Sequence, residues 1–504
     1  MSGGRVCHYI AHVVSVGGDV TMQLTKSQQI RARLNHPIID SDGHTFELPL
    51  VFLDYLKSVA GPRAVERFQT AYFDTFADPR WSKFSVEERR ERRNLRPTWW
   101  AIPARNTTDL ATAIFPKLMY ERLPEMGLDF SVVYPTMGLI LIELPDEELR
   151  RASARALNVM KAETFRGFED RMTPAALIPM HTPDEAIAEL EYAVRTLGLK
   201  SVMMASYARR PIPFAARRWP EAARFTYWMD TFGLDSEHDY DPVWAKCVEL
   251  GIAPTFHSVG YGWGSRTSVS NYVHNHLGNF AASAEAVCRG LFMGGVPKRF
   301  PKLRCAFLEG GMAWARSLYS DLIGHWKKRN GEAMQLYNPG LIDRDALLGY
   351  ARKYGGKVAD DRAEEVLESL FNRMGAGYDA NLLDEFAPSG VKSPEDIRDI
   401  FTTSFYFGCE GDDPLNALAW KAMGTPFDAK LKALYGSDIG HWDVPDMLEC
   451  AEEAYELVED KLIDPGQLRE FVFTNAVHFW TATNRDFFKG TAVESEANQC
   501  LADG

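Results

Sequence analysis

Short apolar runs, separated by longer stretches with helical spacing, make up most of the chain. Most of these runs are continuously apolar rather than alternating, which is typical of parallel strands covered on both faces. We predict eight buried strands: Pro37–Ser41, Phe130–Pro135, Ala176–Met180, Ser201–Ala205, Ile252–His257, Leu303–Leu308, Thr402–Gly408 and Ala433–Ser437.

The stretches between these runs have the marks of amphipathic helices. "TPDEAIAELEYAVRTLGL" has acidic residues in its first turn and a glycine near its end, and it leads directly into the strand in "KSVMMA". "DYDPVWAKCVELGIAPTFH" repeats this order of helix, glycine and strand. Such alternation indicates βαβ units. Eight strands predict an α/β fold, a (β/α)8 TIM-type barrel; a doubly wound sheet with additional strands is the alternative.

Two connections are much longer than the usual βα loop of roughly 2–6 residues. They are residues 50–129 after the first strand and residues 316–400 after the sixth, and both contain helical patterns. Loops at the C-terminal ends of barrel strands surround the mouth of the barrel. We therefore expect both helical insertions over this mouth, the first as a lid. The division is an N-terminal extension (1–35), the barrel (36–490) and a C-terminal tail (491–504).

Composition narrows the class of partner and the compartment. The 504 residues have a formal net charge of -13, which argues against nucleic acid or an anionic membrane as partner. No apolar run approaches the ~20 residues of a membrane helix. The N-terminus lacks the basic start and the cleavage site of a signal peptide. The seven cysteines are dispersed, which indicates reduced thiols and a cytoplasmic location.

Metal-binding and titratable side chains stand at the ends of four predicted strands. Catalytic groups of a barrel come from the C-terminal ends of different strands. Each side chain alone has an ordinary structural interpretation; "GSD", for example, suits a helix N-cap. Their repetition at four strand ends instead predicts a shared metal site. The residues are Asp42, His44, His257, Glu309, Asp438 and His441.

Four motifs resemble the amidohydrolase superfamily, in the branch related to aminocarboxymuconate semialdehyde decarboxylase. They are "IIDSDGH", "PTFHS", "GGVPKRFPKLRCAFLEGGMAW" and "LYGSDIGHWD", and their order matches from about Pro37 to Phe488. The resemblance implies metal ligands at Asp42, His44, His257 and Asp438, although many members have His-x-His in place of the first pair. The predicted fourth strand ends without the lysine that bridges two metals in binuclear members. A single ion is therefore expected.

The resemblance also implies roles around this ion. Two imidazoles and two carboxylates suit Zn²⁺ first, with Fe²⁺ and Mn²⁺ as alternatives. Asp438 is the expected base for a metal-activated water. Glu309 is expected to be an acid in the pocket. His441 would hold Asp438 or a substrate oxygen, or it would only bond to the backbone at a helix start.

Aromatic and polar residues in the long connections indicate where a substrate would bind. Trp99 and Trp100 in the first insertion predict a sizeable apolar substrate under the lid. Arg266 and His276, in the segment after the fifth strand, complete the predicted substrate-binding set. The nearby His274 would point away from His276 on a helix, so neither histidine is predicted as a ligand.

The predicted function is a metal-dependent hydrolase that acts on an acyl bond (ester, amide, lactone or thioester) of a small molecule. The alternative is a non-oxidative decarboxylase or hydratase of an aromatic or unsaturated carboxylic acid. A decarboxylase must deliver a proton to carbon, and the sequence does not predict an imidazole in position for this step, so hydrolysis ranks first. A barrel that only binds is disfavoured by the intact metal set. We also expect a homodimer.

Overall fold

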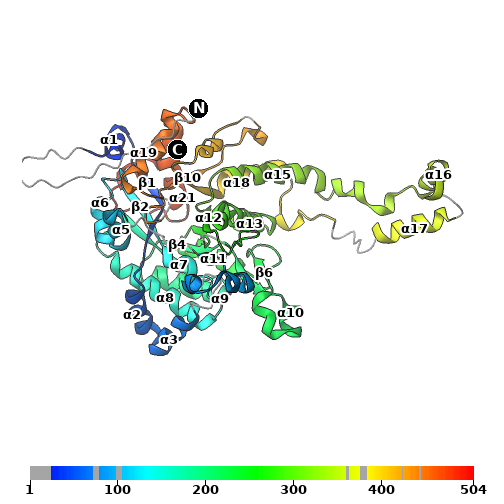
Figure 1. The fold of residues 1–504 in the computed structure, drawn as a ribbon. Helices are drawn as coiled ribbons and strands as arrows, with labels where there is room; N and C mark the ends of the chain where they lie inside the picture. Colours follow the sequence, from blue (N-terminus) through cyan, green and yellow to red (C-terminus); the bar gives the residue numbers. More distant parts are fainter. Residues whose placement is uncertain are drawn as a thin grey trace, which may run out of the picture.

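A nearly closed barrel of eight parallel strands forms the centre of the computed structural model (Figure 1). The structure describes residues 24–71, 79–97, 105–259, 262–358, 362–374, 383–422, 424–441 and 444–503. Every predicted strand is present, so the TIM-type barrel is confirmed. The strands are β1 (Ile39–Thr45), β2 (Phe130–Pro135), β3 (Met172–Ile178), β4 (Ser201–Ala205), β7 (Pro254–His257), β8 (Cys305–Phe307), β9 (Phe405–Glu410) and β10 (Ala433–Gly436).

The barrel closes between its first and last strands. Neighbouring strands follow the order β1-β2-β3-β4-β7-β8-β9-β10, and each pair in this order is parallel. Beyond the end of β10, the Asp438 amide donates to the Asp42 carbonyl at 2.8 Å and the His44 amide donates to the Ile439 carbonyl at 2.7 Å. These bonds join β1 to the segment after β10. An open, doubly wound sheet would keep these two strands apart, so that alternative is wrong.

Helices cover the outside of the barrel, and their ends carry the expected signals. Thr182 and Glu185 form a capping box at the start of α9, and Gly251 ends α11 in the left-handed conformation. The helices next to the strands are α7 (Thr136–Leu141), α8 (Glu147–Thr164), α9 (Pro183–Glu191), α11 (Asp241–Leu250), α13 (Asn279–Met293), α14 (Val296–Arg299), α15 (Ala313–Arg329), α18 (Pro394–Thr403), α19 (Cys450–Glu459), α20 (Pro465–Arg469) and α21 (Asn475–Thr483).

The first insertion lies partly on the flank of the barrel and partly beside its mouth. Its helix α2 packs against α8. Trp81 and Arg96 donate to the carbonyls of Val269 and Ser268, in the segment after β7, both at 3.0 Å. Trp99 and Trp100 lie outside the described residues, so the lid stays a prediction. The helices are α2 (Pro49–Ala60), α3 (Pro62–Ala71), α4 (Val86–Arg92), α5 (Thr107–Ile114) and α6 (Pro116–Arg122).

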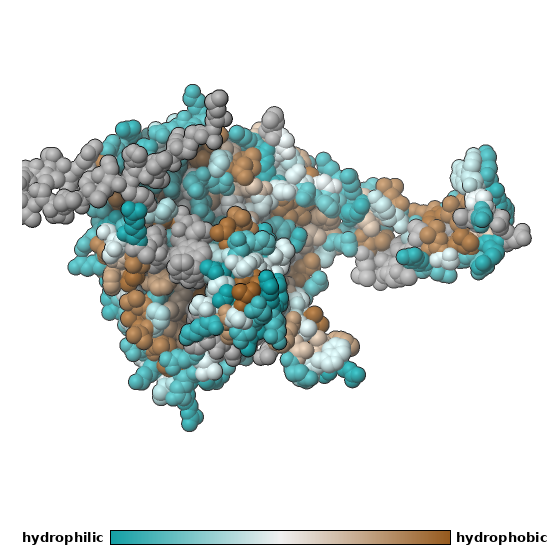
Figure 2. Space-filling model, viewed as in Figure 1, coloured by the Kyte–Doolittle hydropathy of each residue, from teal (hydrophilic) through white to brown (hydrophobic). Residues whose placement is uncertain are grey.

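The second insertion contains two helices that extend away from the barrel, α16 (Arg344–Tyr354) and α17 (Ala363–Met374) (Figure 1). The expectation that this insertion covers the mouth is wrong for these helices. Ion pairs such as Arg344–Glu368 at 2.5 Å hold α16 against α17. Figure 2 shows hydrophobic surface on this projection. The exposed apolar side chains of α17 include Val366 and Leu370. The two helices contact each other rather than the barrel core.

Three smaller features complete the fold. After β4, β5 (Ala208–Pro211) and β6 (Tyr227–Asp230) pair as an antiparallel hairpin, and α10 (Pro213–Arg218) lies in the loop between them. The short helix α12 (Tyr272–His276) follows β7. At the N-terminal end, α1 (Lys26–Arg33) packs on α19, with Ser27 Oγ donating to the Leu448 carbonyl at 2.6 Å. At the C-terminal end, α22 (Glu494–Asp503) packs on α21. The predicted domain boundaries stay predictions.

Two further observations concern the class of protein. Within the described residues, no helix combines the length and the apolar character needed to cross a membrane. The six cysteines of the described ranges are all buried and outside any disulfide.

Candidate metal centre

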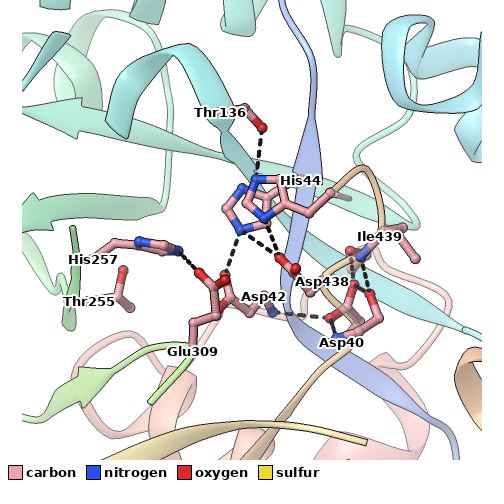
Figure 3. Close-up of polar contacts among 12 residues, drawn as sticks. Asp40, Asp42, His44, Thr136, Thr255, His257, Glu309, Asp438 and Ile439 are labelled. Atoms are coloured by element: carbon pink, nitrogen blue, oxygen red, sulfur yellow. Dashed lines mark hydrogen bonds and ion pairs between the residues drawn. The ribbon is translucent and has the colours of Figure 1, made fainter. Parts of the chain in front are cut away.

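Six buried side chains converge at the C-terminal ends of four strands (Figure 3). Their potential ligand atoms lie within 4.8 Å of one another in two overlapping groups. We call them together the strand-end cluster. The first group is Asp42, His44, His257 and Glu309, and the second is His44, Glu309, Asp438 and His441.

In the first strand, the Asp40 carboxylate has a structural role, whereas Asp42 and His44 face the cluster. The register of β1 against β2 shifts between Asp40 and Gly43, as in a β-bulge, which can redirect side chains near a site. Asp40 accepts hydrogen bonds from Ser131 Oγ at 2.6 Å and from Ser437 Oγ at 2.8 Å. It therefore ties β1 to β2 and to the end of β10. Asp42 is left to face the cluster (Figure 3).

The turns after β8 and β10 hold two cluster residues in an unusual backbone conformation. Glu309 has a φ of +56° and Asp438 a φ of +49°, the left-handed region that is uncommon for side chains other than glycine. Such conformations concentrate at functional sites, where the surrounding structure maintains them. Gly440, with φ +92°, packs against β1, and a Cβ there would lie 2.4 Å from the His44 carbonyl oxygen. The β10 turn thus requires glycine.

Short distances join the imidazoles to the carboxylates. His44 Nε2 lies 3.3 Å from Asp42 Oδ1 and 3.4 Å from Asp438 Oδ1. His257 Nε2 lies 2.8 Å from Glu309 Oε2, and His441 Nδ1 lies 2.7 Å from Asp438 Oδ1. No single strand could provide this set. The centre depends on the closed barrel.

Burial keeps His44 and His257 neutral. Burial and then the neighbouring His441 lower the pKa of His257 to about 3. The pKa of His44 is also well below its usual value, first through burial and then through His441 and His257. The pKa of Asp42 is raised by burial and then by Asp40. Neutral imidazole is the form that binds metal, and a cation would reverse the cost of ionising Asp42.

The residues present fit a divalent ion. Asp42 Oδ1, His44 Nε2 and His257 Nε2 are buried without a hydrogen-bond partner among the described residues, although buried polar atoms are normally bonded. The Ser258 carbonyl lies 3.1 Å from His257 Nδ1, which leaves Nε2 for a ligand when Nδ1 carries the proton. Nitrogen and carboxylate oxygen donors together suit zinc and other first-row ions.

Three of the predicted ligands, Asp42, His44 and His257, share one group, whereas Asp438 belongs to the other group with His44. The structure also gives the predicted acid a second possible role. Glu309, expected only as a pocket acid, belongs to both groups of potential ligands. His441 contacts Asp438, one of the arrangements expected for it. The individual roles remain predictions.

The predicted substrate-binding residues stand farther out. His276 on α12 is separated from His257 by the ring of Phe280, whose centroid is 5.3 Å from each imidazole. Arg266 donates through Nε to the Leu277 carbonyl at 2.7 Å and so braces the loop after β7. Neither residue belongs to the strand-end cluster.

Sequence reasoning missed two supports of the cluster. Thr136 Oγ1 lies 3.1 Å from His441 Nε2. Lys161, buried on α8, pairs with Glu47, and Glu47 also accepts from the Met137 amide at 2.7 Å. The Lys161 charge contributes to lowering the pKa of His44. No motif connects residues so far apart in the chain, and a lysine inside a helix normally indicates a solvated face.

The structure thus combines a TIM-type barrel with buried imidazoles and carboxylates at its strand ends, a set of side chains suited to a divalent metal ion. The family model described as Amidohydrolase matches residues 115–363, just under half of the chain. This match agrees with the family resemblance read from the motifs.

Several solved structures are similar to this chain at low sequence identity. An amidohydrolase from Mycobacterium avium subsp. paratuberculosis is 16% identical with a TM-score of 0.50, covering 89% of this chain and 100% of its own. A 5-carboxyvanillate decarboxylase from Novosphingobium aromaticivorans, with bound manganese, is 13% identical with a TM-score of 0.47, covering 91% and 100%. A manganese-bound dihydroxybenzoic acid decarboxylase from a Polaromonas species is 13% identical with a TM-score of 0.45, covering 90% and 99%.

Proposed function

We propose that the strand-end cluster catalyses the non-oxidative decarboxylation of a small aromatic or unsaturated carboxylic acid. The observation that carries the proposal is the position of His441. Its ring stacks on that of His44 with 3.7 Å between centroids, and it contacts Asp438 and Thr136. The ranking of hydrolysis first rested on the lack of a placed imidazole. With His441 in the cluster, an imidazole is available to supply, through Asp438, the proton that replaces the one given to carbon.

In our assignment Asp42, His44 and His257 would hold one divalent ion, and Asp438 would complete the set. Asp438 is grouped with His44, and both His44 and Glu309 belong to the two groups of potential ligands. Once bound, the ion supplies a Lewis acid that polarises a substrate oxygen. The share of carboxylates in the cluster favours Mn²⁺ or Fe²⁺ beside the Zn²⁺ expected from the sequence.

The reaction needs one proton at carbon. In our assignment, Glu309 delivers this proton to the carbon that bears the substrate carboxylate. The bond between that carbon and the carboxylate then breaks, carbon dioxide leaves, and the bonding electron pair restores the unsaturated system. Glu309 Oε2 lies 2.8 Å from His257 Nε2, which places this carboxyl beside the proposed position of the ion. The His441–Asp438 contact can move the next proton toward the cluster.

Hydrolysis of an acyl bond is the second candidate, and the Asp438–His441 pair favours it as well. A carboxylate that contacts an imidazole can take a proton from water and give it to the leaving group. This reaction would not need Glu309 to carry a proton. The role of Glu309 therefore separates the two candidates.

One experiment distinguishes them. Protein loaded with Mn²⁺ or Zn²⁺ is incubated in oxygen-18 water with a panel of hydroxybenzoic acids and with a panel of aryl esters and lactones. Release of carbon dioxide from an acid, without oxygen-18 in a new carboxylate, is the expected result. Oxygen-18 in the carboxylate product of an ester or lactone, without carbon dioxide release from any acid, would establish hydrolysis instead.

A further inference from the structure

A cavity of about 360 Å³ opens at the end of the barrel opposite the metal centre. Arg304 directly precedes β8 and Lys432 directly precedes β10, and both line this cavity. The strand-end cluster follows the C-terminal ends of the same two strands. The cavity is therefore at the N-terminal face, separated from the cluster by the length of the barrel.

The charged groups of this cavity are all basic. Arg304, Lys432, His478 and Arg485 line it, and none of the described residues that line it is Asp or Glu. Lys432 Nζ contacts the Tyr406 hydroxyl at 3.1 Å, a neutral partner. Arg304 donates through Nη1 to the carbonyls of Pro301 and Leu303. A chain with net charge -13 thus gathers basic side chains here, and no carboxylate of the described ranges lines the cavity with them.

The basic groups destabilise one another's charged forms. Burial and then the charge of Arg304 lower the pKa of Lys432 to about 8. Burial and then Lys432 lower the pKa of His478. A half-buried cation normally has a carboxylate partner, since desolvation and like charges both oppose ionisation. An anion in the cavity would compensate all of these groups together.

We propose that this cavity is a binding site for a phosphate group. A doubly charged oxyanion compensates two of the basic groups at once, which a carboxylate with one charge cannot do. The guanidinium groups of Arg304 and Arg485 can donate paired N–H bonds to phosphate oxygens, and Lys432 supplies a compact charge. The cavity also extends to the apolar side chain of Leu501, so it has room for an organic group attached to the phosphate.

Isothermal titration calorimetry of the full chain in 150 mM chloride tests the site with inorganic phosphate, glycerol 3-phosphate, sulfate and acetate. We expect one phosphate per chain with a Kd below about 1 mM, competition by sulfate, and acetate at least tenfold weaker. Glycerol 3-phosphate binding more tightly than phosphate would identify an ester as the ligand, and the reverse order the free ion; both support the site. Acetate equal to phosphate, or no phosphate binding at 10 mM, would overturn it.

Variants locate the binding. Arg304→Gln/Lys432→Gln should weaken phosphate binding at least tenfold. Arg485→Gln, at an exposed position that folding tolerates, should weaken it at least threefold. The matched control, Lys117→Gln/Arg217→Gln, removes the same two charge types from exposed helix positions and should leave the Kd unchanged.

Phosphate can also bind to metal ions, and His257→Ala addresses this. This variant should bind phosphate as the unmodified chain does. Loss of binding in His257→Ala, or full binding in both cavity variants, would show that phosphate occupies another place and would overturn the proposal.

Discussion

The imidazole rings of His44 and His441 stack with 3.7 Å between their centroids, although His44 lies near the end of β1 and His441 lies beyond the last strand. The contact places both rings against Asp438. It makes His441 part of the site rather than an ordinary residue at a helix start. Its position beside the predicted ligands is the basis for ranking decarboxylation above hydrolysis.

Replacing a predicted ligand should remove the metal. In His257→Ala we expect metal content to fall by at least tenfold, because Nε2 faces the cluster and no other described side chain replaces it. Elemental analysis of the purified protein measures this. His276→Ala is the control, because Phe280 separates that imidazole from His257, and it should retain the metal. Full occupancy in His257→Ala would refute the ligand assignment.

Glu309→Gln should lower kcat by about 10²–10⁴-fold for decarboxylation, the usual contribution of a proton-transferring group. The amide keeps the shape but cannot carry the proton. Metal content must be measured in parallel, because Glu309 also lies within ligand distance. Retained metal with lost turnover supports the proton role. Unchanged turnover with retained metal would instead favour hydrolysis by Asp438.

His441→Asn tests the stacked imidazole. We expect retained metal, a fall in kcat of about 10–100-fold, and the loss of one pH-dependent step in the rate profile. Thr136→Val removes the hydroxyl that contacts His441 Nε2 at 3.1 Å and should have a smaller effect in the same direction. A role confined to packing would lower stability in both variants without changing the pH profile.

Asp40→Ala should destabilise the fold by about 3 kcal/mol, because it removes charged hydrogen bonds and leaves the buried hydroxyls of Ser131 and Ser437 without their acceptor. Urea unfolding measures the change. Ser437→Ala, which removes one of these donors, should cost about 1 kcal/mol. Equal stability of Asp40→Ala and the unmodified chain would contradict the structural role of this carboxylate.

Glu453 makes stability depend on pH. Burial, followed by Asp412 and neighbouring glutamates, raises its pKa from 4.5 to about 7. The folded state thus binds a proton more tightly, so the contribution is full below pH 4.5 and is lost as pH rises through 7. Glu453→Gln should raise Tm at pH 8 and change it little at pH 5. Thermal unfolding at both values measures this, and an equal shift at both would exclude titration as the cause.

The strands and the candidate ligands could be predicted from the sequence, because buried parallel strands are continuous apolar runs and site residues stand where those runs end. Asp40 shows the limit of this reasoning. It has the same spacing from Asp42 as Asp42 has from His44, yet a register shift turns it toward Ser131 and Ser437. Local spacing contains no information about such a shift.

Contacts between distant segments could not be predicted from the sequence either. Arg210 stands in a segment rich in arginine and proline, which is typical of a solvated loop. It lies instead on β5, and its guanidinium donates to Asp230 on β6 at 2.9 Å. The buried Lys161–Glu47 pair joins α8 to the segment after β1. Both pairs depend on tertiary packing, which overrides the usual preference of charged residues for the surface.

The closure of the barrel between β1 and β10 has a consequence for the newly made protein. Asp40 and Ser437, 397 positions apart, must meet before the predicted ligands of the first strand can face Asp438. A ribosome-bound chain that stops short of β10 would lack one side of the centre, however well its other strands had formed. Acquisition of the ion would then be a late event in biogenesis, and the cell could tell a finished molecule from an unfinished one by whether it retains metal.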